Sequence, residues 1–195
     1  MLNPIVFKKH FSILNNDIVC TRGIDDRVGC LALIDMLKLV HNKELGVKLS
    51  FVWSVQEEIG LRGARVVANT MRPDYVFAID TYTTTDAPDM PSHLEPVKLG
   101  DGPVLRMIDS RAIASPILRE MITKVAKEHD IPVQLGITGG TTDGAAVQEC
   151  GALTMPLGIP LRYTHSLVEC YHKNDLKHLI QLLMRIIKEI EKREG

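Results

Sequence analysis

Short apolar runs of the kind that form β-strands alternate along this chain with stretches in which apolar residues recur at helical spacing. The helical spacing is clearest at 27–40, where it predicts an amphipathic helix. The run at 75–79 is almost continuously apolar, which is typical of a strand in a sheet covered on both faces. This alternation predicts an α/β fold, a three-layer sandwich with a mostly parallel mixed sheet, formed as a single domain by residues 1–195.

The same patterns place the other elements. Further strands are expected at 5–7, 17–20, 47–55, 103–108, 133–137 and 153–159, the last of them interrupted by Pro156. Further helices are expected at 60–69, 116–129, 145–149 and 173–193. The three prolines of 86–96 predict a loop, and the glycines and polar residues of 139–144 predict a turn.

The composition narrows the class of partner. The formal net charge of -1 does not favour nucleic acid or an anionic membrane as the main partner. No apolar run approaches the roughly 18–20 residues of a membrane span, and the first residues lack a signal-peptide pattern, so we expect a cytoplasmic protein. The four cysteines form no Cys-x-x-Cys pair, and buried free thiols are therefore expected rather than a zinc knuckle.

Four polar clusters, at 23–27, 56–60, 78–81 and 162–166, interrupt the apolar elements. Each follows a strand-like run, and open α/β sheets usually build their sites at strand ends and in the loops beyond them. Carboxylates brought together at neighbouring strand ends would repel one another, and a divalent cation is the usual compensation. The clusters therefore point to a metal site.

Each cluster also has a simpler interpretation when it is taken alone. The paired aspartates could cap the helix at 27–40, the paired glutamates could form a solvated helix start, and Asp80 could belong to a turn. A single histidine such as His165 is more often structural or exposed than a metal ligand. Only the order and spacing of all four clusters favour a shared site.

That order and spacing resemble those of a known enzyme family. The chain contains Asp25-Asp26-Arg27, then Gln-Glu-Glu-Ile-Gly-Leu-Arg-Gly-Ala at 56–64, Ala-Ile-Asp at 78–80, Gly-Gly-Thr-Thr-Asp at 139–143, and Arg-Tyr-Thr-His-Ser at 162–166 followed by Glu169. From about Pro4 to its last helix it resembles the metallo-aminopeptidases that include glutamyl aminopeptidase, deblocking aminopeptidase and the tetrahedral archaeal aminopeptidases. Some members of this family carry the older label endoglucanase.

The resemblance implies a role for five residues. Asp25 matches the aspartate that bridges two metal ions, whose peptide bond to the next residue is cis in the wider clan. Glu58 and His165 match the other ligands of one metal ion, and Asp80 matches a ligand of the second. Glu57 matches the general base that takes a proton from the metal-bound water. The implied metals are zinc, cobalt or manganese.

The chemistry of these side chains supports the assignment independently. Carboxylate and imidazole groups suit the same divalent metals. Because neighbouring residues just past a strand point to different sides, Glu58 can bind metal while Glu57 stays free to move a proton.

The chain departs from the family pattern upstream of Asp25. Members carry a further histidine ligand in a His-x-Asp motif and a small inserted β domain used in self-assembly, and His10 does not match that motif. We therefore expect a truncated zinc-peptidase-like catalytic domain that lacks its N-terminal strands and inserted β domain. We also expect about one tight ion at Asp25, Glu58 and His165, a weak second site at Asp25 and Asp80, and a homo-oligomer formed through uncovered sheet.

The leading functional hypothesis is a metal-dependent aminopeptidase that removes N-terminal residues from peptides. One alternative is a catalytically impaired remnant or non-catalytic subunit that retains one metal site. A second alternative is a glycosidase that uses Glu57 with another carboxylate. The glycosidase hypothesis gives no catalytic role to His165 or Asp80.

Overall fold

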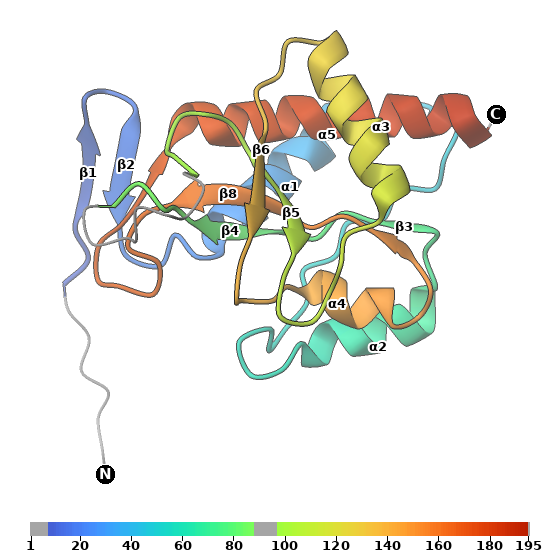
Figure 1. Ribbon diagram of the computed structural model, residues 1–195, viewed down its shortest axis with the longest axis horizontal. Helices are drawn as coiled ribbons and strands as arrows, with labels where there is room; N and C mark the ends of the chain where they lie inside the picture. The colour runs from blue at the N-terminus through green and yellow to red at the C-terminus, as the bar shows by residue number, and fades with distance from the viewer. Residues whose placement is uncertain (1–7, 88–96, 195) are drawn as a thin grey trace.

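The computed structural model describes residues 8–87 and 97–194 (Figure 1). Its strands are β1 (Phe11–Leu14), β2 (Ile18–Thr21), β3 (Tyr75–Val76), β4 (Ile79–Thr83), β5 (Val104–Ile108), β6 (Gln134–Ile137), β7 (Leu153–Thr154), β8 (Leu157–Leu161) and β9 (Glu169–His172). Its helices are α1 (Arg27–Val40), α2 (Arg62–Met71), α3 (Pro116–Glu128), α4 (Asp143–Gln148) and α5 (Lys173–Glu194).

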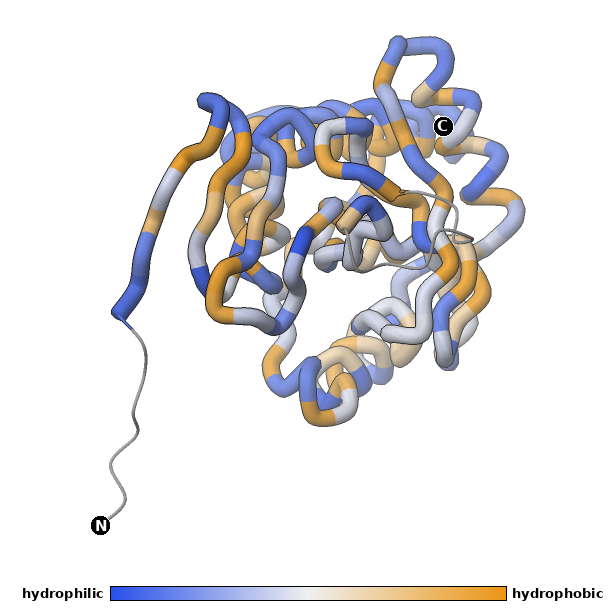
Figure 2. The backbone as a smooth tube through the Cα atoms, turned by 60° about the vertical axis from the view of Figure 1, so that its left-hand side comes forward, coloured by the Kyte–Doolittle hydropathy of each residue, from blue (hydrophilic) through white to orange (hydrophobic). Residues whose placement is uncertain are grey.

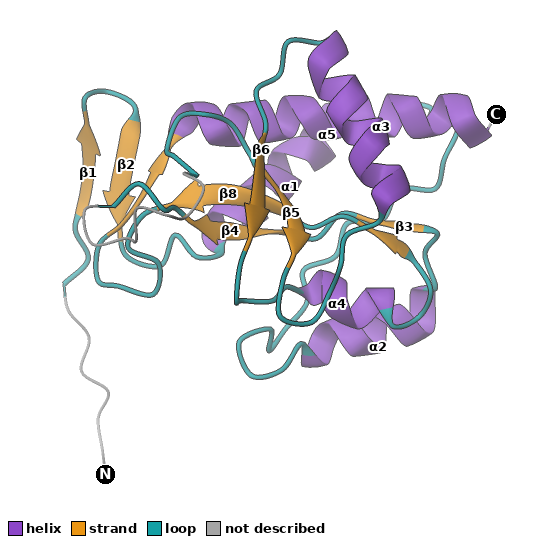
Figure 3. Ribbon diagram, viewed as in Figure 1, coloured by secondary structure: helices purple, strands orange, loops and turns teal. Residues whose placement is uncertain are grey.

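The strands lie between two layers of helices (Figures 1 and 3). Helix α5 packs against α1 and α3 in one layer, and α2 packs against α4 in the other. In the central sheet, of order β4-β8-β5-β6, the pairs β4–β8 and β5–β6 are parallel and the pair β5–β8 is antiparallel. Strands β3 and β7 form a short parallel pair, and β1-β2-β9 form an antiparallel sheet. The predicted α/β sandwich with a mostly parallel mixed sheet is confirmed.

The core is built around β8, whose five residues are all buried. Hydrophobic residues of α5, among them Leu179, Leu182 and Ile186, are fully buried in the same cluster as Ile159. Figure 2 shows orange and blue residues following one another along the helices, as expected when one face of each helix packs on a sheet and the other meets solvent.

Most predicted elements appear with small differences at their ends. The helix predicted at 27–40 has those bounds, because Asp26 caps it by accepting a hydrogen bond from the N–H of Gly29. The helix predicted at 60–69 begins only at Arg62, since the residues before it turn with positive φ. The strand predicted at 153–159 is divided at Pro156 into β7 and β8.

Two predictions need correction, and two others fall wholly or mostly outside the described residues. The segment 47–55 is irregular, with bends at Val47 and Val55, and pairs with no strand in the described parts of the chain. The four cysteines are free as predicted, but only Cys20 and Cys170 are buried. Cys30 is half-buried, and Cys150 is exposed in the turn after α4. The strand predicted at 5–7 lies outside the described residues, as does most of the loop predicted at 86–96.

Among the described helices, none is both long and apolar enough to cross a membrane.

The buried position of Ile159 predicts a large stability difference between two isoleucines. Ile159 in β8 is 0% exposed, whereas Ile137 in β6 is 71% exposed. We expect Ile159→Ala to lower the free energy of unfolding by about 2–5 kcal/mol, and Ile137→Ala to change it by no more than about 0.5 kcal/mol. Urea denaturation followed by circular dichroism measures both, and equal losses would show that β8 is not the centre of the core.

Candidate metal centre

Three predicted ligands come from three different loops and strand ends, and the structure brings them together. Asp25 lies between β2 and α1, Glu58 lies before α2, and His165 lies in the loop between β8 and β9. The Nε2 atom of His165 is 2.9 Å from Oδ2 of Asp25 and 3.9 Å from Oε1 of Glu58. One ligand atom from each residue lies within 4.8 Å of the others, which is close enough to share one ion.

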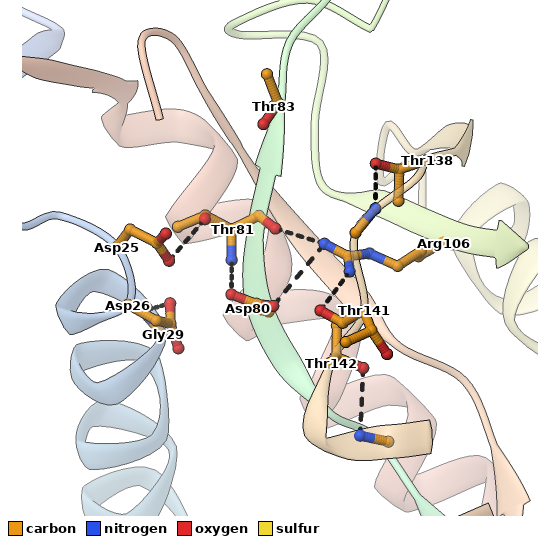
Figure 4. Close-up of polar contacts among 12 residues, drawn as sticks. Asp25, Asp26, Gly29, Asp80, Thr81, Thr83, Arg106, Thr138, Thr141 and Thr142 are labelled. Carbon is orange, nitrogen blue, oxygen red and sulfur yellow. Dashed lines mark hydrogen bonds and ion pairs between the residues drawn. The ribbon is translucent and has the colours of Figure 1, made fainter. Parts of the chain in front are cut away.

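A second group of carboxylates lies beside the first and shares Asp25 with it. Asp25, Asp26 and Asp80 offer oxygen atoms that lie within 4.8 Å of one another. The peptide bond between Asp25 and Asp26 is cis, as the resemblance implied. Asp26 was not among the predicted ligands, because the resemblance assigned a ligand role to Asp25 alone. In the structure the Asp26 side chain caps α1 (Figure 4).

Asp80 is held in this group by its neighbours on the central sheet. Its Oδ1 accepts a hydrogen bond of 2.7 Å from the N–H of Thr81, and the Thr81 hydroxyl donates at 2.9 Å to Asp25 (Figure 4). The guanidinium of Arg106 lies 3.8 Å from Oδ2 of Asp80. Arg106 is itself buried and donates to the carbonyl oxygens of Thr81 and Thr141. The backbone N–H of Thr81 and the guanidinium of Arg106 therefore orient the Asp80 carboxylate, and two carbonyl oxygens hold the guanidinium in place.

Glu169 connects the loops that carry Asp25 and His165. Its buried carboxylate accepts hydrogen bonds from the N–H groups of Ile24 at 2.5 Å, Asp25 at 3.2 Å and His165 at 2.9 Å. Strand β9 begins at Glu169 and pairs there with Thr21 of β2. The sequence analysis noted Glu169 after the histidine motif but assigned it no role. Its hydrogen bond with Asp25 joins residues 144 positions apart, and such a contact leaves no local sequence signal.

Glu57 and Glu58 differ in their surroundings. The Glu58 side chain is 70% exposed, whereas Glu57 is half-buried. The turn that follows them is tight, because Gly60 and Leu61 both donate backbone hydrogen bonds to the carbonyl oxygen of Glu57. Asp25, Glu57, Glu58, Asp80, Arg106 and His165 line one pocket of about 430 Å³. The two glutamates therefore reach the same pocket from adjacent positions.

The electrostatics of the pocket fit a cation. Burial, and then the charge of Asp80, raise the pKa of Glu57 to about 7. Burial raises the pKa of Asp80 to about 6 against the opposing effect of Arg106, and burial with the charge of Asp80 raises that of Asp26 to about 9. When no metal ion is bound, burial and neighbouring negative charges favour the protonated form of these carboxyl groups. Two carboxylates and an imidazole are also a donor set that zinc, cobalt and manganese accept.

These pKa values predict how stability depends on pH when no metal is present. Because the folded pKa of Glu57, Asp26 and Asp80 lies above the usual value near 4, the folded state holds protons that the unfolded state has released. We therefore expect the melting temperature in chelator to fall from pH 5 to pH 8. Saturating zinc should reverse much of this fall, since the ion binds the ionised carboxylates of the folded state.

The control for this prediction is Glu57→Gln, which removes one of the three titrating groups. Its melting temperature in chelator should depend less on pH than that of the unchanged chain. A melting temperature of the unchanged chain that rises between pH 5 and pH 8 in chelator would contradict the expectation.

Comparison with known proteins identifies the family to which the chain belongs. Residues 1–182 match the M42 glutamyl aminopeptidase family. The chain is 33% identical over 189 residues to the lysyl aminopeptidase of Pyrococcus furiosus, covering 95% of this chain and 53% of that protein. It is 29% identical over 178 residues to the glutamyl aminopeptidase of Lactococcus lactis, covering 90% of this chain and 49% of that protein.

A solved structure is similar over the same extent. The Pyrococcus horikoshii TET1 peptidase, described as assembling into a tetrahedron or a large octahedral shell, matches with a TM-score of 0.84 and 43% identity, covering 93% of this chain and 53% of that one. The chain thus spans about half the length of the relatives it matches. With the family match extending over residues 1–182, this chain belongs to the M42 glutamyl aminopeptidase family.

Proposed function

We propose that this chain supplies the metal-binding and proton-transfer residues of an aminopeptidase that removes N-terminal residues from peptides. The observation that carries the proposal is the convergence of Asp25, Glu58 and His165 beside a half-buried Glu57 that belongs to neither group of candidate ligands. The names of the lysyl and glutamyl relatives support peptides as substrates. The proposed catalytic domain is the single domain formed by residues 1–195.

In the proposed reaction Asp25, Glu58 and His165 would hold one metal ion, and Asp25 with Asp80 would hold a second. A bound divalent ion makes water acidic and polarises the peptide carbonyl. Glu57 receives the proton of the attacking water at its carboxylate and passes it to the leaving amine. Its pKa of about 7 without metal suits a group that both accepts and donates a proton near neutral pH. Glu169 holds the loops that carry Asp25 and His165 in position during this transfer.

Zinc or cobalt is the proposed metal, with manganese as a further member of the same chemical class. The proposed location is the cytoplasm. The proposed assembly is a homo-oligomer, which the shells described for the TET1 peptidase support.

A remnant with one metal site is the second candidate, and one observation favours it. The group of Asp25, Asp26 and Asp80 contains no imidazole, and Asp26 is already engaged in capping α1. A glycosidase remains the weaker alternative, since it would leave the contact between His165 and Asp25 without a catalytic purpose.

The proposed function is tested with the purified chain loaded with zinc or cobalt. Release of the first amino acid from short peptides is measured, with the same peptides acetylated at the N-terminus as controls. Cleavage of the free peptides alone supports an aminopeptidase. Equal cleavage of acetylated peptides would reject an aminopeptidase, because the free N-terminus would then not be required. No cleavage with either metal would reject aminopeptidase activity for this chain alone and favour the remnant.

Metal binding is expected to be asymmetric. Asp25, Glu58 and His165 form a set with an imidazole and an open position, so we expect about one tight zinc per chain. The second group lacks an imidazole, and repulsion from the first ion weakens it further. A second ion should therefore bind only at high metal concentration.

Titration calorimetry with elemental analysis measures this stoichiometry. His165→Ala should abolish the tight site, whereas His129→Ala, an exposed histidine at the end of α3, should leave it intact. Two equally tight ions per chain would show that another group replaces the missing imidazole.

A further inference from the structure

Two of the four cysteines face each other across neighbouring strands. Strands β2 and β9 are antiparallel, and their register places Cys20 directly opposite Cys170. The sulfur atoms of these two free thiols are 2.9 Å apart, and the residues are only 4% and 7% exposed. Cys20 and Cys170 lie 150 residues apart in the sequence, so no local pattern predicts that they meet.

The backbone hydrogen bonds of Cys170 show which kind of cross-strand pair this is. Its N–H and C=O groups both bond to the backbone of Arg162, which follows β8. Both groups therefore point away from β2, and Cys20 and Cys170 form a non-hydrogen-bonded pair. In such a pair the Cα atoms are typically about 4.5 Å apart, and the side chains lie closer together than in a hydrogen-bonded pair.

This geometry suits a covalent bond between the two sulfur atoms. Disulfides usually join residues whose Cα atoms are about 4.4–6.8 Å apart, so a non-hydrogen-bonded pair can be joined without separating its strands. The other two cysteines lie in different surroundings. Cys30 is half-buried on α1, and Cys150 is exposed in the turn after α4.

The pair also lies beside the loops that carry the candidate metal ligands. Strand β2 leads into the segment that contains Asp25. Cys170 directly follows Glu169, whose carboxylate accepts hydrogen bonds from the N–H groups of Asp25 and His165. Strands β1 and β2 lie at one end of the molecule (Figure 1). A bond between β2 and β9 would therefore join strands that must separate when this end unfolds.

We propose that Cys20 and Cys170 are a site of reversible disulfide formation, and that the bond clamps β2 to β9 and stabilises the folded chain. The oxidant is an organic disulfide such as oxidised glutathione. One cysteine loses its proton and attacks a sulfur atom of the oxidant, which forms a mixed disulfide and releases one thiol. The second cysteine then loses its proton and attacks the sulfur atom of the first, which releases the second thiol. Two electrons and two protons pass from the protein to the oxidant.

The reaction should be slow because both thiols are buried. Burial, and then the hydrogen bond with Cys20, raise the pKa of Cys170 to about 12. Since the thiolate is the reacting form, we expect the bond to form over hours rather than seconds. Once formed, it closes a long loop, which restricts the unfolded chain more than the folded one.

The test uses the full chain carrying Cys30→Ser and Cys150→Ser, in which the proposed pair supplies the remaining thiols. The folded protein is incubated with oxidised glutathione in chelator, and free thiols are counted after denaturation. We expect both thiols to be lost, the mass to fall by two hydrogen atoms, and proteolysis to yield a peptide in which Cys20 is linked to Cys170. The melting temperature in chelator should rise by at least about 5 °C, and excess dithiothreitol should reverse both changes.

The matched control adds Cys170→Ser to the same chain. It keeps one thiol and can form no bond within the chain, so the oxidant should not raise its melting temperature. If circular dichroism shows that this variant is unfolded, Cys170→Ala replaces it. Peptide mapping of the oxidised chain with all four cysteines decides in either case, since it shows directly which cysteines are joined.

Four results would overturn the proposal. Both thiols could remain free in the folded protein, or react only after denaturation in urea. Both could stop at mixed disulfides with glutathione, or the bond could join two chains, which a non-reducing gel shows as a dimer. Finally, a bond between Cys20 and Cys170 that fails to raise the melting temperature would show that it is no clamp. None of these readouts depends on peptidase activity or bound metal, so this proposal can fail independently of the proposed function.

Discussion

Glu57→Gln is expected to lower peptidase activity by about 10²–10⁴-fold while leaving the number of bound zinc ions per chain unchanged. The amide is close in size to the carboxylate but cannot accept the proton of the attacking water. Glu57 is half-buried and lies outside both groups of candidate ligands, Asp25 with Glu58 and His165, and Asp25 with Asp26 and Asp80. The loss should therefore appear in the proton-transfer step alone.

Glu58→Gln is the matched control for this prediction, because it makes the same chemical change at the neighbouring position. It should lower zinc affinity, since the Glu58 carboxylate is one of three donors within 4.8 Å. Activity is measured as amino-acid release at saturating zinc, and bound zinc by elemental analysis. If Glu57→Gln loses as much zinc as Glu58→Gln, Glu57 is a ligand and the division of roles between the two glutamates is wrong.

Glu169→Gln is expected to weaken zinc binding by about 10–100-fold, although Glu169 is not itself a proposed ligand. Its two carboxylate oxygens accept hydrogen bonds from the N–H groups of Ile24, Asp25 and His165. In glutamine one oxygen becomes an NH₂ group, which would face an N–H donor instead of accepting from it. The loops that present Asp25 and His165 should then separate, and the ligand atoms with them.

The control is Glu149→Gln, at an exposed glutamate that ends α4. It should bind zinc like the unchanged chain. Calorimetric zinc titration separates the two variants, and near-ultraviolet circular dichroism shows whether the Glu169 variant keeps its packing. A Glu169→Gln variant that is well packed and binds zinc with unchanged affinity would show that its hydrogen bonds do not position the ligands.

The helix at 27–40 illustrates what local patterns predict well. Its apolar spacing and its capping aspartate are both contained within the segment, and the structure has the same bounds. The start of α2 was misplaced by two residues because the positive φ of Leu61 depends on the turn around Glu57 rather than on helix propensity. Strands β1 and β9 were not predicted, since their pairing with β2 joins distant parts of the chain.

The segment 47–55 shows the opposite limit. Its run of valine, leucine, phenylalanine and tryptophan residues predicted a strand, and in the structure Val47, Leu49 and Phe51 are partly buried while Lys48 and Ser50 are exposed. A β-strand in a sheet also needs a hydrogen-bonded neighbour, and no described residue provides one. Side-chain pattern alone therefore predicts which side chains of a segment are buried but not whether its backbone is paired.

The sequence by itself determined the α/β class, the family resemblance, and the five residues Asp25, Glu57, Glu58, Asp80 and His165 as candidates for one site. These follow from residue types and spacings, which are local properties of the chain. Only the tertiary structure decided that Asp26 lies with Asp25 and Asp80, that Arg106 faces Asp80, and that Glu169 holds two ligand loops together. Most of these contacts depend on how strands distant in the sequence pair with one another. Hydrogen bonds between buried groups form only after that pairing has brought donor and acceptor to within about 3 Å of each other.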